Sequence, residues 1–353
     1  MSGVFLRLAC TAALAAQTAL APVPALAAPG DPERPLSQLL TDLQRLYRGT
    51  EQATETYNAT AEKLARQRAE VARLDDELAR ARLSLRDSRT DAGRLARQQY
   101  QNSGGLGPYV RVLLARDPQH ALDEGHVIGE LTRERARTVA RLDEAEQRKD
   151  SLARAARKAL DAQLSLAGRQ KKQRDDVRTR LGDVERLLAS LTPDQLAAVA
   201  RLEQQGVTEA QERLGSAGSL PDDGRPATPA GDRAVRFALD QVGKPYQWGS
   251  AGPVAYDCSG LTSRAWSDAG TPIPRTSQEQ WRLLPKVPLK ELRPGDLVVY
   301  FPEATHVAMY VGGGNVVQAP RPGEQIKVSP LASYPILGAV RPDPAQAPAT
   351  EAR

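Results

Sequence analysis

Cysteine and histidine are scarce in this chain of 353 residues, which contains two of the former and three of the latter. Cys258 and His306 lie in the C-terminal third, whereas Cys10 lies near the N-terminus and His120 and His126 lie beside a break in a helical pattern. The C-terminal region therefore offers one thiol and one imidazole, so a cysteine hydrolase could be built there in only one way. Because the chain has no cluster of ligating residues, we expect neither a metal nor a cofactor.

Aromatic residues make up only 4% of the chain, and Ala, Leu, Arg, Glu and Gln crowd its first two thirds. This composition excludes a large mixed core in that part and favours long helices. The net charge is +5 and the pI is near 9.2, but acidic and basic residues interleave along the helical part. The charge pattern argues against a nucleic-acid surface and leaves a mild attraction to anionic cell-envelope polymers.

The N-terminus is typical of a signal peptide over residues 1–27. A basic start precedes an apolar stretch, and Ala25-Leu26-Ala27 provides a cleavage site of small residues. A retained anchor is the alternative, but the stretch is rich in alanine and interrupted by prolines, which makes it a poor bilayer span. We therefore expect a secreted protein, and its mild attraction to anionic envelope polymers agrees with a place at the cell wall. After cleavage Cys258 would be its single cysteine, which excludes an internal disulfide and leaves a buried or a reactive thiol.

Residues 28–214 form a predicted helical coiled-coil region. Apolar residues recur with the spacing of the a and d positions of a heptad repeat. One position holds Leu36, Leu43, Tyr57, Leu64, Val71, Leu78, Leu85 and Ala92, and the other holds Leu39, Leu46, Ala53, Leu74, Ala81 and Leu95. Thr50, Thr60, Gln67 and Ser88 interrupt this seam.

The first helix must stop at residues 102–108, where three glycines and a proline follow Asn102. Helical patterning resumes near Val127 and continues to Leu191, which predicts an antiparallel hairpin. Parallel dimerisation is the alternative, and the oligomeric state stays open. Thr192 then caps a shorter helix to about Leu214, and residues 215–231 form a linker rich in Gly, Ser, Pro and Asp.

Residues 232–342 form a predicted α+β domain, followed by a disordered tail over 343–353. Helical patterns cover 232–242 and 258–270, and Thr276 opens a third helix. Short runs with strand character follow at 296–301, 306–311, 315–318, 325–328 and 336–340. The helices come first in the chain and the strands of an antiparallel sheet follow, which is the order of an α+β domain.

The placement of Cys258 at a helix start favours a thiolate, because unpaired backbone N–H groups and the positive end of the helix dipole lie there. His306 opens a strand directly after a turn, from where its side chain can reach the helix terminus. The backbone N–H of Cys258 would then be available to an oxyanion.

Five segments carry a family resemblance, in family order over about 110 residues. They are Pro245-Tyr246-Gln247-Trp248-Gly249, Asp257-Cys258-Ser259-Gly260-Leu261, Pro274-Arg275-Thr276-Ser277, Arg293-Pro294-Gly295-Asp296-Leu297 and His306-Val307-Ala308-Met309-Tyr310-Val311-Gly312. Together they strongly resemble NlpC/P60 cysteine peptidases. The resemblance implies a papain-like fold and hydrolysis of peptidoglycan stem peptides, typically at the D-γ-glutamyl-diaminopimelate bond.

The same resemblance implies roles for particular residues. Cys258 would be the nucleophile, His306 the base, and Gln318 the third polar residue, where the family usually has a His. A Gln carbonyl can hold the imidazole but cannot stabilise an imidazolium as a carboxylate would. Tyr246 would lie near the nucleophile, and Asp257, Ser259 and Arg275 would line the substrate groove. Tyr246 could instead be a core aromatic residue, and Arg275 could be solvated.

The order of signal peptide, coiled coil, linker and C-terminal domain resembles the secreted RipA-like peptidoglycan endopeptidases of actinobacteria. In that architecture the coiled coil is a regulator of the active site or an arm that docks on a membrane division complex. A catalytically weak or silent cell-envelope adaptor is the alternative function, and acyl transfer to an amide outside the wall would use the same nucleophile. The tether between arm and domain also suggests autoinhibition.

Overall fold

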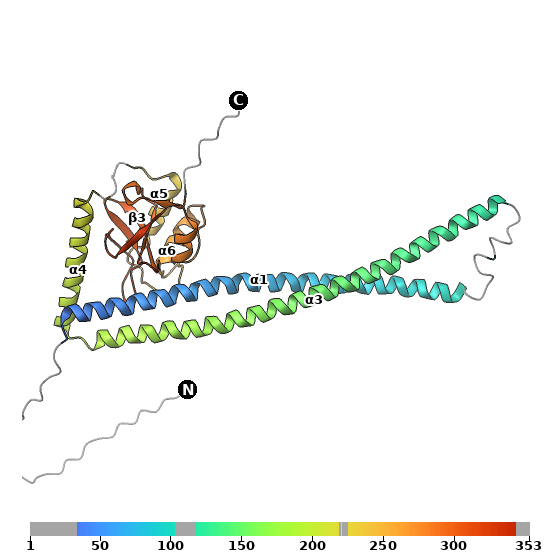
Figure 1. The fold of residues 1–353 in the computed structure, drawn as a ribbon, viewed down its shortest axis with the longest axis horizontal. Coiled ribbons are helices and arrows are strands. Elements are labelled where there is room, and N and C mark those ends of the chain that lie inside the picture. Colours follow the sequence, from blue (N-terminus) through green and yellow to red (C-terminus); the bar gives the residue numbers. More distant parts are fainter. Residues whose placement is uncertain (1–33, 103–109, 111–117, 219, 221–224, 344–353) are drawn as a thin grey trace, which may run out of the picture.

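The computed structural model describes residues 34–102, 110, 118–218, 220 and 225–343. It has a long helical arm and a small α+β domain that lies against one end of it (Figure 1). The predicted signal peptide and nearly all of the predicted tail lie outside the described residues. Within the described part of the chain, no helix combines the length and the apolar character needed to cross a membrane.

The arm is a hairpin of two helices, α1 (Leu36–Asn102) and α3 (Pro118–Ala189), which run antiparallel along most of their length (Figure 1). The predicted architecture of a long helical hairpin before an α+β domain is therefore confirmed. Seam residues such as Leu64, Leu78 and Leu85 are at most 7% exposed. The polar seam residue Gln67 donates from Nε2 to the Ala159 carbonyl oxygen at 3.0 Å, so it is satisfied across the hairpin.

The second arm helix begins at Pro118, nine residues before the start that the apolar pattern indicates. Proline suits the first turn of a helix, because its missing N–H has no partner there in any case. Leu122 and Val127 are 73% and 56% exposed in this first part of α3. The pattern gave no signal for these turns because their apolar residues are not buried on one face.

A third long helix, α4 (Pro193–Ser216), leaves the arm and runs along the side of the domain (Figure 1). It starts with the predicted cap: Thr192 Oγ1 accepts from the Gln195 N–H, and the Gln195 side chain accepts from the Thr192 N–H at 2.9 Å. Its Val199 packs with Leu39, Leu43 and Val184 of the arm. Helix α4 therefore connects arm and domain as a rigid element over most of its length.

The domain has three helices and a six-stranded antiparallel sheet. The helices are α5 (Pro229–Leu239), α6 (Cys258–Asp268) and α7 (Ser277–Leu283), with a 3-10 turn at Leu289–Glu291. The strands are β1 (Lys286–Val287), β2 (Leu297–Tyr300), β3 (His306–Gly312), β4 (Asn315–Gln318), β5 (Lys327–Pro330) and β6 (Ile336–Val340), in the spatial order β1-β6-β2-β3-β4-β5. The predicted α+β class is confirmed.

Three local details differ from the sequence pattern. Helix α5 begins at Pro229 instead of residue 232, because Thr228 accepts from the Gly231 N–H and caps the helix earlier. Strand β5 begins two residues later than expected, at Lys327. Strand β1 has only two residues, too few to show an alternating pattern.

Successive side chains along the central strands point to opposite faces of the sheet, and both faces are buried. Leu297, Val299 and Met309 face helices α5 and α6, whereas Val298 and Tyr310 belong to a second cluster on the other side. All five are at most 1% exposed. Trp266 of α6 anchors the first cluster and donates from Nε1 to the Gly295 carbonyl oxygen at 3.1 Å. This packing fixes the start of α6 against the start of β3.

We expect Leu261→Ala to lower the free energy of unfolding of the domain by about 2–5 kcal/mol, because Leu261 is fully buried and its loss leaves a cavity. Denaturant unfolding followed by tryptophan fluorescence measures this directly, because all three tryptophans lie between residues 248 and 281. The control is Leu283→Ala in α7, whose side chain is 54% exposed and whose loss should change stability by less than about 0.5 kcal/mol. Equal effects of the two substitutions would contradict the core described above.

Candidate active site

Cys258 is the first residue of α6 and lies in a turn that its neighbours hold rigidly. The Asp257 carboxylate caps the helix by accepting from the Gly260 N–H at 2.6 Å. A Cβ at residue 260 would lie 2.2 Å from the Ser250 carbonyl oxygen, so only glycine allows the preceding loop to pack here. The thiol is 3% exposed, and the backbone N–H of Val307 in β3 lies against it.

The imidazole of His306 is held from the neighbouring strand. Its Nε2 lies 2.7 Å from Oε1 of Gln318, the last residue of β4. Since a Gln carbonyl oxygen only accepts, Nε2 carries the proton of this bond and Nδ1 is left for other chemistry. The Tyr334 ring packs on the imidazole edge to face at a centroid distance of 5.0 Å, and Tyr300 packs at 5.7 Å. The imidazole is thereby fixed in orientation and fully buried.

Helix α1 lies directly over these residues and contacts them with two carboxylates. Glu55 accepts from Ser259 Oγ at 2.6 Å and from the Ser277 N–H at 3.0 Å, and its Oε1 lies 3.7 Å from Cys258 Sγ. Glu51 Oε1 lies 3.2 Å from His306 Nδ1, an ion-pair contact without the alignment of a hydrogen bond. Both carboxylates are at most 4% exposed. The closed arm therefore occupies the space in front of the thiol and the imidazole.

Two neighbouring residues of α1 extend this contact. Asn58 donates from Nδ2 to Asp257 Oδ2 at 3.0 Å. The Tyr57 ring packs edge to face on Trp248 at 5.2 Å. The segment of α1 from residue 50 to residue 60 is thus covered by the domain on one side and by α3 on the other.

The closed arm changes the titration of the groups that it covers. The pKa of the Cys258 thiol is raised well above its ordinary value by burial first, and then by the carboxylates of Glu55, Asp257 and Glu51. Burial lowers the pKa of His306, but the charge and contact of Glu51 outweigh it, and the net shift is upward. Burial and the nearby Asp257 raise the pKa of Glu55 to about 7. The thiol is thus kept neutral while α1 is in place.

The residues that sequence motifs singled out converge on one place. The groups around the thiol are Tyr246, Asp257, Ser259, Arg275, His306 and Gln318. Arg275 is 15% exposed and forms a two-pronged ion pair with Asp257, at 2.9 Å and 2.7 Å, and it also donates to Ser259 Oγ. Tyr246 is buried, and the nearby thiol and carboxylates contribute to its raised pKa after burial itself.

Sequence reasoning missed the contribution of α1 to this site. In the sequence, nothing distinguishes Glu51, Glu55 and Asn58 from surface residues of an amphipathic helix. No motif indicated that the backbone N–H of Ser277 binds a carboxylate. One signal was available: residues 48–63 contain no Leu, Ile, Val, Met or Phe, although they lie in the middle of a heptad pattern. Such a gap indicates a stretch that packs against a polar partner.

The raised pKa of Glu55 predicts that the arm closes more tightly in acid. Its carboxyl titrates near 4.5 when solvated and at about 7 when closed, so the closed state gains from protonation below pH 4.5 and loses this gain as the pH rises to 7. The raised pKa values of His306 and Cys258 act in the same direction at higher pH. Other titratable or charged groups near Glu55 are Asp257, Arg275 and His306.

Hydrogen exchange of residues 50–60, corrected for intrinsic amide chemistry, measures this closure. We expect protection to fall from pH 4.5 to pH 6.5 in the native chain and to stay nearly constant over that range in Glu55→Gln. The control is Glu70→Gln, a solvated carboxylate of the same helix paired with Arg73. The same slope in Glu55→Gln as in the native chain would show that another group is responsible.

Comparisons with known proteins agree with this geometry. Residues 243–337 match the model of the NlpC/P60 family. A probable endopeptidase of Corynebacterium glutamicum is 42% identical over 116 residues, which are 33% of this chain and 56% of that protein. A probable endopeptidase of Mycobacterium bovis is 29% identical over 351 residues, covering 87% of this chain and 90% of that one. The peptidoglycan endopeptidase RipA of Mycolicibacterium smegmatis is 36% identical over 111 residues, covering 28% and 22%. Residues 243–337, which contain Cys258, His306 and Gln318, are therefore an NlpC/P60 domain.

Proposed function

We propose that this protein is a secreted cysteine endopeptidase that cleaves the stem peptides of peptidoglycan. The observation that carries the proposal is the arrangement of Cys258 at a helix N-terminus, with His306 and Gln318 paired at 2.7 Å on the adjoining strands of an NlpC/P60 domain. The names of the relatives support the same activity. Residues 1–27 have the pattern of a signal peptide, which supports export to the cell wall.

The geometry supports a thiolate mechanism with a covalent intermediate. Nδ1 of His306 takes the proton of the Cys258 thiol, because Nε2 is engaged by Gln318. The thiolate attacks the scissile carbonyl carbon, and the Cys258 N–H at the start of α6 stabilises the oxyanion. The imidazolium then protonates the leaving amine, the C–N bond breaks, and a thioester remains. Water, deprotonated by the same imidazole, releases the acyl half as a carboxylate and restores the thiol.

Gln318 positions the base without adding a charge. Its carbonyl oxygen fixes the imidazole ring in the tautomer that leaves Nδ1 free to accept a proton. A carboxylate in this place would also stabilise the imidazolium, and Gln318 does not. The positive end of α6 and the departure of Glu55 from the thiol then have the larger share in forming the thiolate.

The contacts of Glu55 support a substrate with a free carboxylate beside the scissile bond. Ser259 Oγ and the Ser277 N–H hold this carboxylate 3.7 Å from the nucleophile, and the cation of Arg275 lies close by. A γ-linked glutamate has a free α-carboxylate on the acyl side of its amide. We therefore assign cleavage to the D-γ-glutamyl-diaminopimelate bond, with Asp257, Ser259 and Arg275 in the groove and Tyr246 beside the thiol.

We expect Cys258→Ala to abolish the release of cleaved stem peptides from purified cell walls, because Cys258 is the only cysteine among the described residues. The measurement is mass spectrometry of the soluble fragments, which also identifies the bond. Both forms should carry the arm-opening substitutions described below, so that the closed arm does not hide activity. Equal release by the two forms would refute the mechanism, and the absence of release from both would favour a silent envelope adaptor.

The arm is the regulator of this activity in our proposal. With α1 in place, substrate cannot reach the groove, and burial together with the nearby Glu55 and Glu51 raises the pKa of the Cys258 thiol, which keeps the thiol neutral. Opening removes the steric block and the unfavourable charges together. The arm therefore inhibits the domain both by covering it and by changing its protonation.

We expect Glu51→Ala combined with Glu55→Ala to raise the rate of wall hydrolysis by the full mature chain at least severalfold. The substitutions remove the two carboxylates that bind the site and leave the arm hairpin itself intact. The matched control replaces Glu70 and Glu77 by Ala, which are glutamates of α1 that face Arg73 in solvent. Unchanged hydrolysis by the double variant would remove arm inhibition from the proposal.

The far end of the arm supports docking on a membrane division complex. There α1 and α3 diverge (Figure 1), and α3 exposes Leu122, Val127, Leu131 and Val139 by 46% to 73%. Apolar side chains grouped at the tip of a charged helix are suited to a protein partner. Because α1 runs unbroken from this tip to the active site, a partner bound at the tip could pull the helix off the groove.

A further inference from the structure

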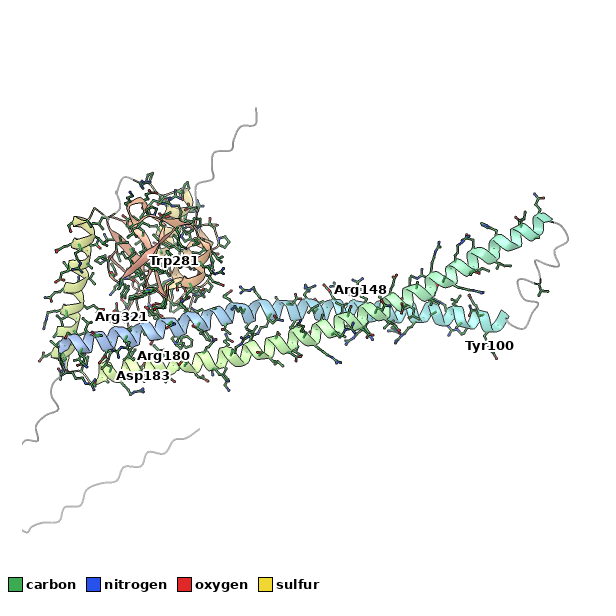
Figure 2. The ribbon with its side chains drawn as sticks, in the orientation of Figure 1. Tyr100, Arg148, Arg180, Asp183, Trp281 and Arg321 are labelled. Carbon is green, nitrogen blue, oxygen red and sulfur yellow. The ribbon has the colours of Figure 1, made fainter. Side chains whose placement is uncertain are left out.

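Arg321 lies outside the proposed catalytic group but next to it. It lies three residues after Gln318, the last residue of β4, at the place where the domain, α1 and α4 come together (Figure 2). Its NH1 and NH2 donate to the two carboxylate oxygens of Glu203 in α4 at 2.7 Å and 2.8 Å. Its Nε donates to Glu324 of the domain, and its guanidinium stacks on the Tyr47 ring at 4.6 Å. Arg321 therefore holds a carboxylate in a fork while a domain residue fixes its direction.

A cavity of about 840 Å³ extends from Arg321 to two residues that contact the imidazole. Glu51, which contacts His306 Nδ1, lines this cavity, and so does Tyr334, whose ring packs on His306. Helices α1 and α4 form its other walls, so the cavity becomes an open shelf when the arm leaves. The residues that the domain contributes are Leu289, Phe301, Arg321, Ala332, Ser333, Tyr334, Pro335 and Ile336. Arg321 is the one charged residue in that set.

The chemistry of the reaction tells which half of the substrate lies on this shelf. His306 protonates the leaving amine, so the amine half of the substrate lies on the imidazole side of the scissile bond. Glu55, in contrast, lies against Cys258, Ser259 and Ser277, on the acyl side. The groove therefore has a cation for each half: Arg275 on the acyl side and Arg321 on the leaving side.

From this arrangement we propose that Arg321 is a binding residue for a free carboxylate on the leaving half of the stem peptide, and that Glu203 occupies its place in the closed arm. The proposal rests on the endopeptidase function given above. A diaminopimelate residue fits this site, because its second carboxylate stands at the end of a methylene chain. The chain can lie on Phe301 and Tyr334 while the carboxylate enters the guanidinium fork. A lysine in the same position has no such carboxylate.

The site also gives α4 a part in closure. Gln211 of α4 donates to the Gly314 carbonyl oxygen at 3.0 Å and accepts from the Ala332 N–H at 2.9 Å, and Glu203 occupies the Arg321 fork. Glu203 and Arg321 are 24% and 17% exposed, so solvent screens this ion pair only partly. Substrate binding on the leaving side would compete with α4, just as binding on the acyl side competes with Glu55.

The test uses the full mature chain with Glu51→Ala, Glu55→Ala and Glu203→Ala, which removes the arm carboxylates near Arg275 and Arg321. On this background, Arg321→Gln is compared with Arg321→Lys and with unchanged Arg321. The matched control is Arg236→Gln, an exposed arginine of α5 paired with Asp232. The probes are the tetrapeptide L-Ala-γ-D-Glu-meso-diaminopimelate-D-Ala and the same peptide with its second diaminopimelate carboxylate amidated.

We expect Arg321→Gln to raise KM for the carboxylate peptide about tenfold with little change in kcat, which corresponds to about 1.4 kcal/mol. KM for the amidated peptide should not change. For the carboxylate peptide, Arg321→Lys should give a KM between those of the Arg321 and Arg321→Gln forms, because lysine keeps the charge but cannot form two parallel hydrogen bonds. Equal effects on both peptides, or no effect on either, would overturn the proposal and leave Arg321 as a contact of the closed arm alone.

Calorimetric titration of the same peptides into the Cys258→Ala form of each variant separates this proposal from the endopeptidase function. Discrimination between carboxylate and amide that depends on Arg321 supports the binding site even when no peptide is cleaved. The absence of cleavage in that case would count against the proposed catalysis and not against the binding site. Binding of both peptides without dependence on Arg321 refutes the site whether or not cleavage occurs.

Discussion

The contact of two buried α1 carboxylates with the thiol and imidazole is the interaction on which the rest of this structure depends. A buried carboxylate is costly unless its oxygens are hydrogen-bonded. Glu55 meets this condition through Ser259 and the Ser277 N–H, whereas Glu51 has only an ion-pair contact with the imidazole of His306. The arm carboxyl groups that contact the site also disfavour a thiolate at Cys258. Closure and loss of nucleophilicity therefore have one physical cause.

This constraint also accounts for the unusual composition of α1. A coiled-coil helix normally buries one stripe, but residues 50–60 are covered on opposite sides by α3 and by the domain. Thr50, Thr54 and Asn58 are at most 2% exposed although all are polar. Small and polar side chains allow the helix to lie close to both partners. They stand at positions where a simple coiled-coil seam would have leucine. The gap in the heptad pattern is the mark of a second binding face.

The two sides of the groove use the same chemistry. On the acyl side a carboxylate from α1 lies near Arg275, and on the leaving side a carboxylate from α4 fills the fork of Arg321. An inhibitory arm that presents carboxylates is well matched to a groove whose proposed substrate has carboxylates on both sides of the scissile bond. In the proposed regulation the arm competes with substrate for the same partners, and an activator needs only to shift that competition.

The sequence by itself determined the helical arm and the α+β class and singled out Cys258 and His306 as the candidate catalytic pair, because heptad spacing, strand alternation and the scarcity of nucleophiles are local properties. The cap at Thr192 and the start of α6 were readable for the same reason. The roles of Glu51, Glu55, Glu203 and Arg321 were decided only by the tertiary structure. Their contacts join residues more than 100 positions apart, and a glutamate on a helix looks the same in sequence whether it faces water or a thiol.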